Sequence, residues 1–119
     1  LFVGLRNWER GEIKARQHQY GIKHLTPEEV AADSDALRAW LKSCGASKVV
    51  VHFDMDVLDP AEIVAAVGTD PDGMKIEAVI RVINDIAAEK ELVGLTVAEP
   101  MPRTAIRLRD MLGRLPLLE

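Results

Sequence analysis

Short apolar runs alternate with amphipathic segments along the whole sequence, and this order restricts the fold more than any other feature. Four runs are expected to be strands: residues 1–5, 21–25, 48–53 and 92–98. Four other segments are expected to be helices: residues 11–20, 26–44, a stretch starting at 72 or 73, and 104–112. Because crossovers between parallel strands are right-handed, this order predicts an α/β fold, a mainly parallel sheet with helices on its faces.

Local signals support two of these elements. The centre of the third strand, Val49-Val50-Val51, is apolar without alternation, which is typical of a parallel strand covered on both faces. Thr26 and Glu29 form the pattern of a capping box around Pro27, which suits the first position of a helix. We therefore expect one helix to run from here to Cys44-Gly45.

Composition excludes several classes of partner. Fifteen Lys and Arg residues against nineteen Asp and Glu residues give a net charge of −4, and no basic run is present. Such a chain has no electrostatic reason to bind nucleic acid or an anionic membrane. No apolar stretch approaches the roughly 20 residues of a membrane span. The single cysteine, Cys44, cannot form an intrachain disulfide, which fits a reducing compartment, so we expect a cytoplasmic protein.

Three aspartates follow the third expected strand: Asp54, Asp56 and Asp59. Ligands of parallel sheets bind beyond the carboxyl ends of the strands, which is where these residues lie. In an extended segment, residues two apart point the same way, so Asp54 and Asp56 could share one cation. Carboxylate oxygens suit magnesium or manganese. The alternative is that these aspartates only cap a loop.

The segment from His52 to Pro60 resembles the signature Ser-Phe-Asp-x-Asp-x-x-Asp-Pro of the ureohydrolase family, which contains arginase, agmatinase and formimidoylglutamase. Further blocks resemble the family in the same order: residues 3–6, 21–30 and 94–100. Three features depart from it, and two of these are replacements. His52 replaces the usual serine and is interpreted as a satisfied core residue, and the family's glycine-rich loop is replaced by residues 64–73.

The resemblance implies a three-layer arginase-like fold and a role for four residues. Asp54 and Asp56 would bind two manganese ions, and Asp59 would orient these ligands and the turn. Glu99 would pair with a substrate guanidinium, since a carboxylate accepts two parallel N–H bonds from that planar group. No residue is assigned as a catalytic acid or base. The implied reaction is hydrolysis of a guanidino or formimino C–N bond, releasing urea or formamide.

The family's Asp-x-His-x-Asp metal motif is missing from these 119 residues. We therefore expect residues 1–119 to be one domain, the C-terminal part of an arginase-like domain whose upstream half is missing. Such a fragment alone is expected to be inactive. The resemblance also implies a homo-oligomer.

Two other functions stay open. Residues 51–58 also resemble the first motif of haloacid-dehalogenase-like magnesium phosphatases, in which the first aspartate is the nucleophile. The chain could instead be a non-catalytic arginase-like module for assembly or regulation. Turnover of an aryl phosphate would favour the first alternative, and absence of the upstream metal motif would favour the second.

Overall fold

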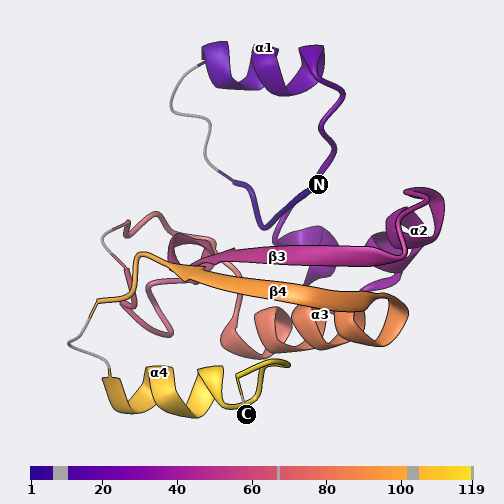
Figure 1. Ribbon diagram of the computed structural model, residues 1–119. Coiled ribbons are helices and arrows are strands. Elements are labelled where there is room, and N and C mark those ends of the chain that lie inside the picture. Colours follow the sequence, from indigo (N-terminus) through magenta and orange to yellow (C-terminus); the bar gives the residue numbers. More distant parts are fainter. Residues whose placement is uncertain (7–10, 67, 102–104, 119) are drawn as a thin grey trace.

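The computed structural model describes residues 1–6, 11–66, 68–101 and 105–118, with the backbone alone for residues 105–107 (Figure 1). The strands are β1 (Phe2–Val3), β2 (His24–Leu25), β3 (Lys48–Asp54) and β4 (Glu91–Ala98). The α-helices are α1 (Gly11–Gln19), α2 (Asp35–Ser43), α3 (Ile76–Glu89) and α4 (Ala105–Leu112). Two short 3-10 helices, η1 (Glu28–Val30) and η2 (Met55–Val57), complete the order. The predicted alternation of strands and helices is confirmed.

The strands form two separate parallel pairs. β1 pairs with β2, and β3 pairs with β4 in a register that sets Val51 opposite Leu95 and Asp54 opposite Ala98. The prediction of parallel strands joined by helices is therefore confirmed. Within the described residues, however, the two pairs do not join into one continuous sheet.

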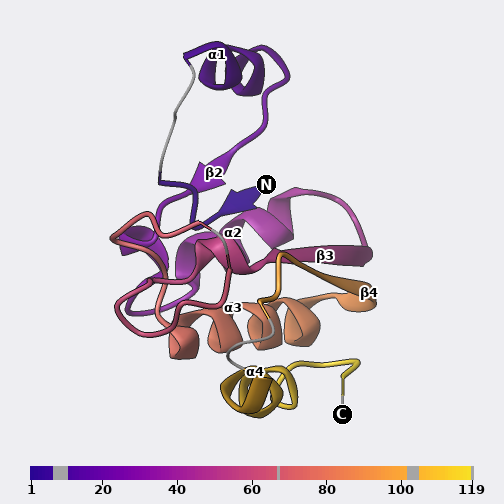
Figure 2. The same ribbon diagram turned by 90° about the vertical axis from the view of Figure 1, so that its left-hand side faces the viewer.

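The described helices leave one face of the β3–β4 pair uncovered. Figure 2 shows α2 and α3 on the same side of these strands, and an ion pair between Arg38 and Asp85 (2.7 Å) joins the two helices. Burial along β3 alternates, from Val50 at 66% exposed to Phe53 at 3%. The prediction that this strand is covered on both faces is wrong for the part of the chain that the structure describes.

The predicted helix over residues 26–44 is divided in two. The capping box does form, since Thr26 donates its N–H to Glu29 Oε2 (2.7 Å) and accepts from Glu29 N. Only the 3-10 turn η1 follows it. Asp33 Oδ1 then accepts the N–H of Asp35 (2.9 Å), and a separate helix, α2, begins at Asp35. Short polar side chains often compete with the helical backbone in this way.

Helix α3 also begins later than predicted, at Ile76 and not at residue 72 or 73. Asp72 has a φ of 61°, which is outside the right-handed helical region. The first N–H of the helix, that of Ile76, is instead satisfied by Glu62 Oε2 at 2.7 Å. A side chain from the preceding loop therefore sets the start of α3.

Helix α4 follows the predicted segment, and the turn after it is fastened to α3 by Arg114. Its guanidinium donates two hydrogen bonds to the Glu77 carboxylate, at 2.7 and 2.6 Å. These bonds lower the pKa of Glu77, so their stabilising effect is present at neutral pH and is lost as the pH falls through that lowered pKa. None of the described helices is long and apolar enough to cross a bilayer.

Candidate active site at the carboxyl ends of β3 and β4

The carboxyl ends of the two long strands meet at one edge. Asp54, the last residue of β3, lies opposite Ala98, the last residue of β4, and Glu99 follows directly. The register therefore places Asp54 and Glu99 at the same edge of the strand pair, as the predicted topology required.

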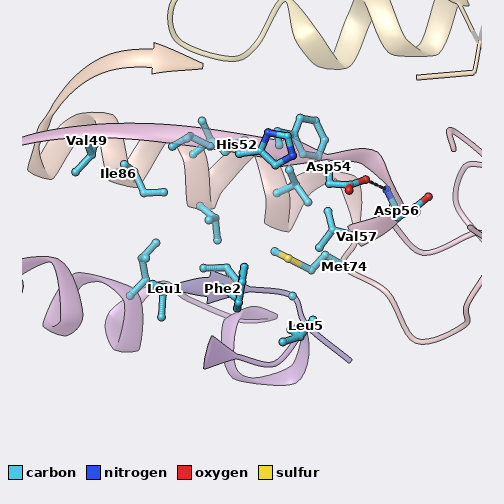
Figure 3. Close-up of a pocket in the computed structure, with 18 of the residues that line it drawn as sticks. Leu1, Phe2, Leu5, Val49, His52, Asp54, Asp56, Val57, Met74 and Ile86 are labelled. Atoms are coloured by element: carbon cyan, nitrogen blue, oxygen red, sulfur yellow. Dashed lines mark hydrogen bonds between the residues drawn. The ribbon is translucent and has the colours of Figure 1, made fainter. Parts of the chain in front are cut away.

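Asp54 and Asp56 line the same cavity, but not for the reason that the sequence suggested. The extended segment ends at Asp54, and Asp56 lies inside the 3-10 turn η2. Asp54 caps this turn, because its Oδ1 accepts the N–H of Asp56 at 3.0 Å (Figure 3). The turn, and not the alternation of a strand, places Asp56 beside Asp54.

A glycine in the following loop holds the carboxylate of Asp56. Gly68 donates its N–H to Asp56 Oδ1 at 2.9 Å. A Cβ on Gly68 would lie 2.7 Å from the same oxygen, closer than side chains tolerate. Gly68 therefore permits a backbone approach that fixes Asp56, a role that the sequence analysis did not identify.

Arg6, the last residue of the block 3–6 that resembles the family, binds the backbone around this site. Its guanidinium donates to four carbonyl oxygens: those of Asp56 (2.8 Å), Asp70 (2.8 Å), Pro71 (3.0 Å) and Val57 (3.5 Å). These carbonyls belong to η2 and to the loop before α3, so one side chain ties both to the end of β1. The sequence offered one signal for this role: Arg6 directly follows an apolar run, at the edge of the predicted sheet where the aspartates also lie.

We expect Arg6→Ala to lower the free energy of unfolding by about 2 kcal/mol, since hydrogen bonds from a charged donor stabilise more than neutral ones. Urea denaturation of the chain measures this loss. Arg16, an exposed arginine on α1, supplies the control, because Arg16→Ala should change stability by less than about 0.5 kcal/mol. Equal stability of the two variants would contradict the proposed role of Arg6.

Asp59 shapes the turn after η2. Its Oδ1 accepts the N–H of Ala61 at 2.8 Å, and its carbonyl oxygen accepts from Glu62 and Ile63. These contacts agree with a residue that orients the turn. This side-chain contact is local, so orientation of the metal ligands by Asp59 stays a prediction.

Glu99 and His52 are both exposed. Glu99 has a φ of 58°, a left-handed conformation that is uncommon for residues other than glycine and that occurs often at functional sites. His52 bonds across the strands to Thr96, with 2.7 Å between Nδ1 and Oγ1. The interpretation of His52 as a core residue is therefore wrong, because its side chain lies on the face of β3 that the described helices leave uncovered.

The two carboxylates fit part of a divalent-metal site. Within the part of the chain that the structure describes, the hydrogen bonds to the Asp54 and Asp56 carboxylates use Oδ1 of each, so the second oxygen of each could bind a cation. Hard oxygen donors are suited to manganese or magnesium. Among the described residues no group of three or more His, Cys, Asp or Glu could hold a metal, so further ligands would have to come from elsewhere.

A family model described as the arginase family matches residues 1–111 of the chain. The chain belongs to the arginase family. This membership favours the ureohydrolase interpretation of residues 51–58 over the phosphatase interpretation, and it confirms the resemblance drawn from the aspartate signature.

Two curated relatives cover most of this chain but only a third of their own length. An N(omega)-hydroxy-L-arginine amidinohydrolase of Streptomyces lavendulae is 32% identical over 99 residues, which are 83% of this chain and 33% of the relative. An N(1)-aminopropylagmatine ureohydrolase of Thermus thermophilus is 27% identical over 101 residues, 84% of this chain and 33% of the relative. The chain thus spans about a third of the length of these relatives.

Solved structures show the same fold. An Entamoeba histolytica arginase, crystallised with L-ornithine, matches with a TM-score of 0.79 at 21% identity, over 95% of this chain and 41% of that protein. Helicobacter pylori arginase matches with a TM-score of 0.81 at 13% identity, over 94% of this chain and 40% of that protein. The chain therefore has the arrangement of part of an arginase domain.

Proposed function

We propose that this chain is the C-terminal part of a metal-dependent ureohydrolase that cleaves a guanidino or formimino C–N bond and releases urea or formamide. One observation supports the proposal most: Asp54, Asp56 and Glu99 lie at one edge of a parallel strand pair, with two carboxylates in one cavity. Family membership and the names of the two curated relatives, which both describe guanidino hydrolysis, support the same chemistry.

In this proposal Asp54 and Asp56 would hold manganese, with further ligands from the upstream half of the domain. Two bound manganese ions would activate water for attack on the guanidinium carbon. Glu99 would accept two N–H bonds from the guanidinium and hold its plane in line for attack. Gly68 and Arg6 would keep Asp56 from moving, through its carboxylate and its backbone.

The test is hydrolysis by the complete protein. With an upstream half that supplies the remaining metal ligands, we expect manganese-dependent release of urea from a small guanidino compound such as agmatine or arginine, or of formamide from a formimino compound. No release from any of these, with manganese bound, would contradict the proposal. The non-catalytic module is the second candidate, because Asp54 and Asp56 each already accept a backbone N–H as loop caps do.

For the 119-residue chain alone, we expect weak divalent-metal binding and no hydrolysis, because two carboxylates cannot complete two nearly octahedral coordination spheres. We also expect self-association, since β3 and β4 present Val50 (66% exposed) and Val93 (50% exposed) on an uncovered face. Metal titration, a urea assay and sedimentation measure the three properties. A monomer of 13.1 kDa that releases urea would contradict this prediction.

A further inference from the structure

The pairing of β3 with β4 changes register once along the strands. Val49 lies opposite Leu92. The next residue of β3, Val50, lies opposite Gly94, so Val93 is an extra residue of β4 and forms a β-bulge. A bulge strengthens the local twist and changes where the following side chains point, and bulges are common next to active sites. The position of the site at the ends of the strands therefore depends on the register after the bulge.

One polar side-chain contact joins the strands between the bulge and the site. His52 and Thr96 lie opposite each other in the register after the bulge, with 2.7 Å between Nδ1 and Oγ1. Continued without the bulge, the earlier register would set Thr96 opposite Phe53, and its side chain would turn to the core face. The contact is therefore possible only in the register that the bulge creates. We call it the His52–Thr96 clasp.

The clasp holds the strand ends on the face that the described helices leave uncovered. On the other face, the core holds them, because Phe53 is buried and Val97 opposite it packs against the same core. Beyond the clasp, the next pair on its own face is Asp54 with Ala98, whose methyl group makes no polar contact. Among the described residues, the clasp is thus the last polar side-chain contact between the strands before Asp54 and Glu99.

We propose that this clasp positions the site, because it fixes the distance between Asp54 and Glu99. Asp54 lies two residues after His52 on β3, where Figure 3 shows the two side chains one after the other. Glu99 lies three residues after Thr96. The ureohydrolase signature has serine where this chain has His52, so an imidazole clasp is a feature of this chain.

The consequence for catalysis rests on the proposed function. With a metal ion on Asp54 and a guanidinium on Glu99, the distance between these residues sets the alignment of the attack. Loss of the clasp should disturb that alignment without removing either group, so it should lower kcat more than it raises KM. His52 and Thr96 are therefore positioning residues, not catalytic ones.

The experiment uses the complete protein with manganese bound. His52→Leu and Thr96→Val each remove one partner of the clasp and keep a side chain of similar size. We expect each to lower kcat about 10-fold, with KM within about 3-fold of the unaltered value and metal content unchanged. The double variant should lose no more than either single variant, because both remove the same bond.

A conservative variant and a matched control separate the bond from the bulk of the ring. The threonine hydroxyl both donates and accepts, and the amide of asparagine can occupy the place of Nδ1, so His52→Asn should keep kcat within about 3-fold. Lys48 and Glu91 also join the two strands, at 3.5 Å, but on the amino side of the bulge. Lys48→Gln should therefore leave kcat unchanged.

Hydrogen exchange tests the clasp without any hydrolysis. Mass spectrometry of the complete His52→Leu protein should show exchange at least about 10-fold faster in residues 52–56 and 95–99, and unchanged exchange in residues 48–50. If the unaltered protein released neither urea nor formamide, the proposed function would fail, and this exchange would decide on the clasp alone. Thr96→Val gives the same readout if circular dichroism shows that His52→Leu does not fold.

Three outcomes would overturn the proposal. The first is unchanged exchange in residues 52–56 after loss of either partner. The second, in a protein that hydrolyses its substrate, is an unchanged kcat for Thr96→Val. The third is additive losses in the double variant, which would show that His52 and Thr96 act separately.

Discussion

Asp54→Asn and Asp56→Asn are each expected to lower manganese-dependent hydrolysis by the complete protein at least about 10³-fold, with loss of bound metal. Asparagine keeps the oxygen that accepts the backbone N–H of Asp56 or Gly68, so the turn η2 and its loop should remain folded. What the substitution removes is the negative charge, on which binding of a hard divalent cation depends. Elemental analysis of the purified variants, together with rates at saturating manganese, measures both effects.

The matched control is Asp110→Asn, which makes the same replacement of a carboxylate by an amide at an exposed aspartate of α4. We expect this variant to keep its metal content and rate. If Asp54→Asn and Asp56→Asn also kept both, the two aspartates would be loop caps only, and the non-catalytic module would be the better description. Retained metal with lost activity would instead place the residues near the reaction but outside the coordination sphere.

The elements that depend on hydrophobic pattern could be predicted from the sequence. β3, β4 and α3 each bury an apolar stripe, so their residues had to be apolar at the right spacing, and they occur within a few residues of the predicted bounds. The edge at which the site forms followed from the same pattern, since parallel strands bring their carboxyl ends together. The same pattern places Asp54 and Glu99 at that edge, at the ends of the third and fourth apolar runs.

The contacts that position the site could not be predicted, because they join segments far apart in the sequence. Arg6 lies about 50 residues from Asp56 and 64 from Asp70, and no local pattern records that pairing. The position of Asp56 depends on whether the 3-10 turn η2 or an extended segment follows Asp54. The hydrogen bond from Asp56 N to Asp54 Oδ1 stabilises the turn. The prediction that β3 is covered on both faces was wrong for a related reason. An apolar run indicates a strand that can be buried, but it does not indicate which segments cover that strand.

Glu99→Gln is expected to lower kcat/KM for the guanidino substrate of the complete protein on the order of 10²-fold or more, with normal metal content. Glutamine keeps the shape of the side chain but removes the charge that pairs with the guanidinium. Glu91→Gln is the matched control, because Glu91 lies at the amino end of the same strand and is also exposed. An unchanged rate for Glu99→Gln would leave Glu99 as an ordinary carboxylate at the end of a strand.

Glu99→Gly separates a functional role from a structural one. The left-handed conformation of Glu99 costs roughly 1 kcal/mol that glycine does not incur, so this variant should be at least as stable as the unaltered protein. Its hydrolysis should nevertheless fall as far as that of Glu99→Gln, because the carboxylate is gone. Thermal unfolding and kcat/KM measured on the same preparation test both statements. A Glu99→Gly variant that lost stability and activity together would show that the side chain supports the strand end, and the assignment of Glu99 to the substrate would then fail.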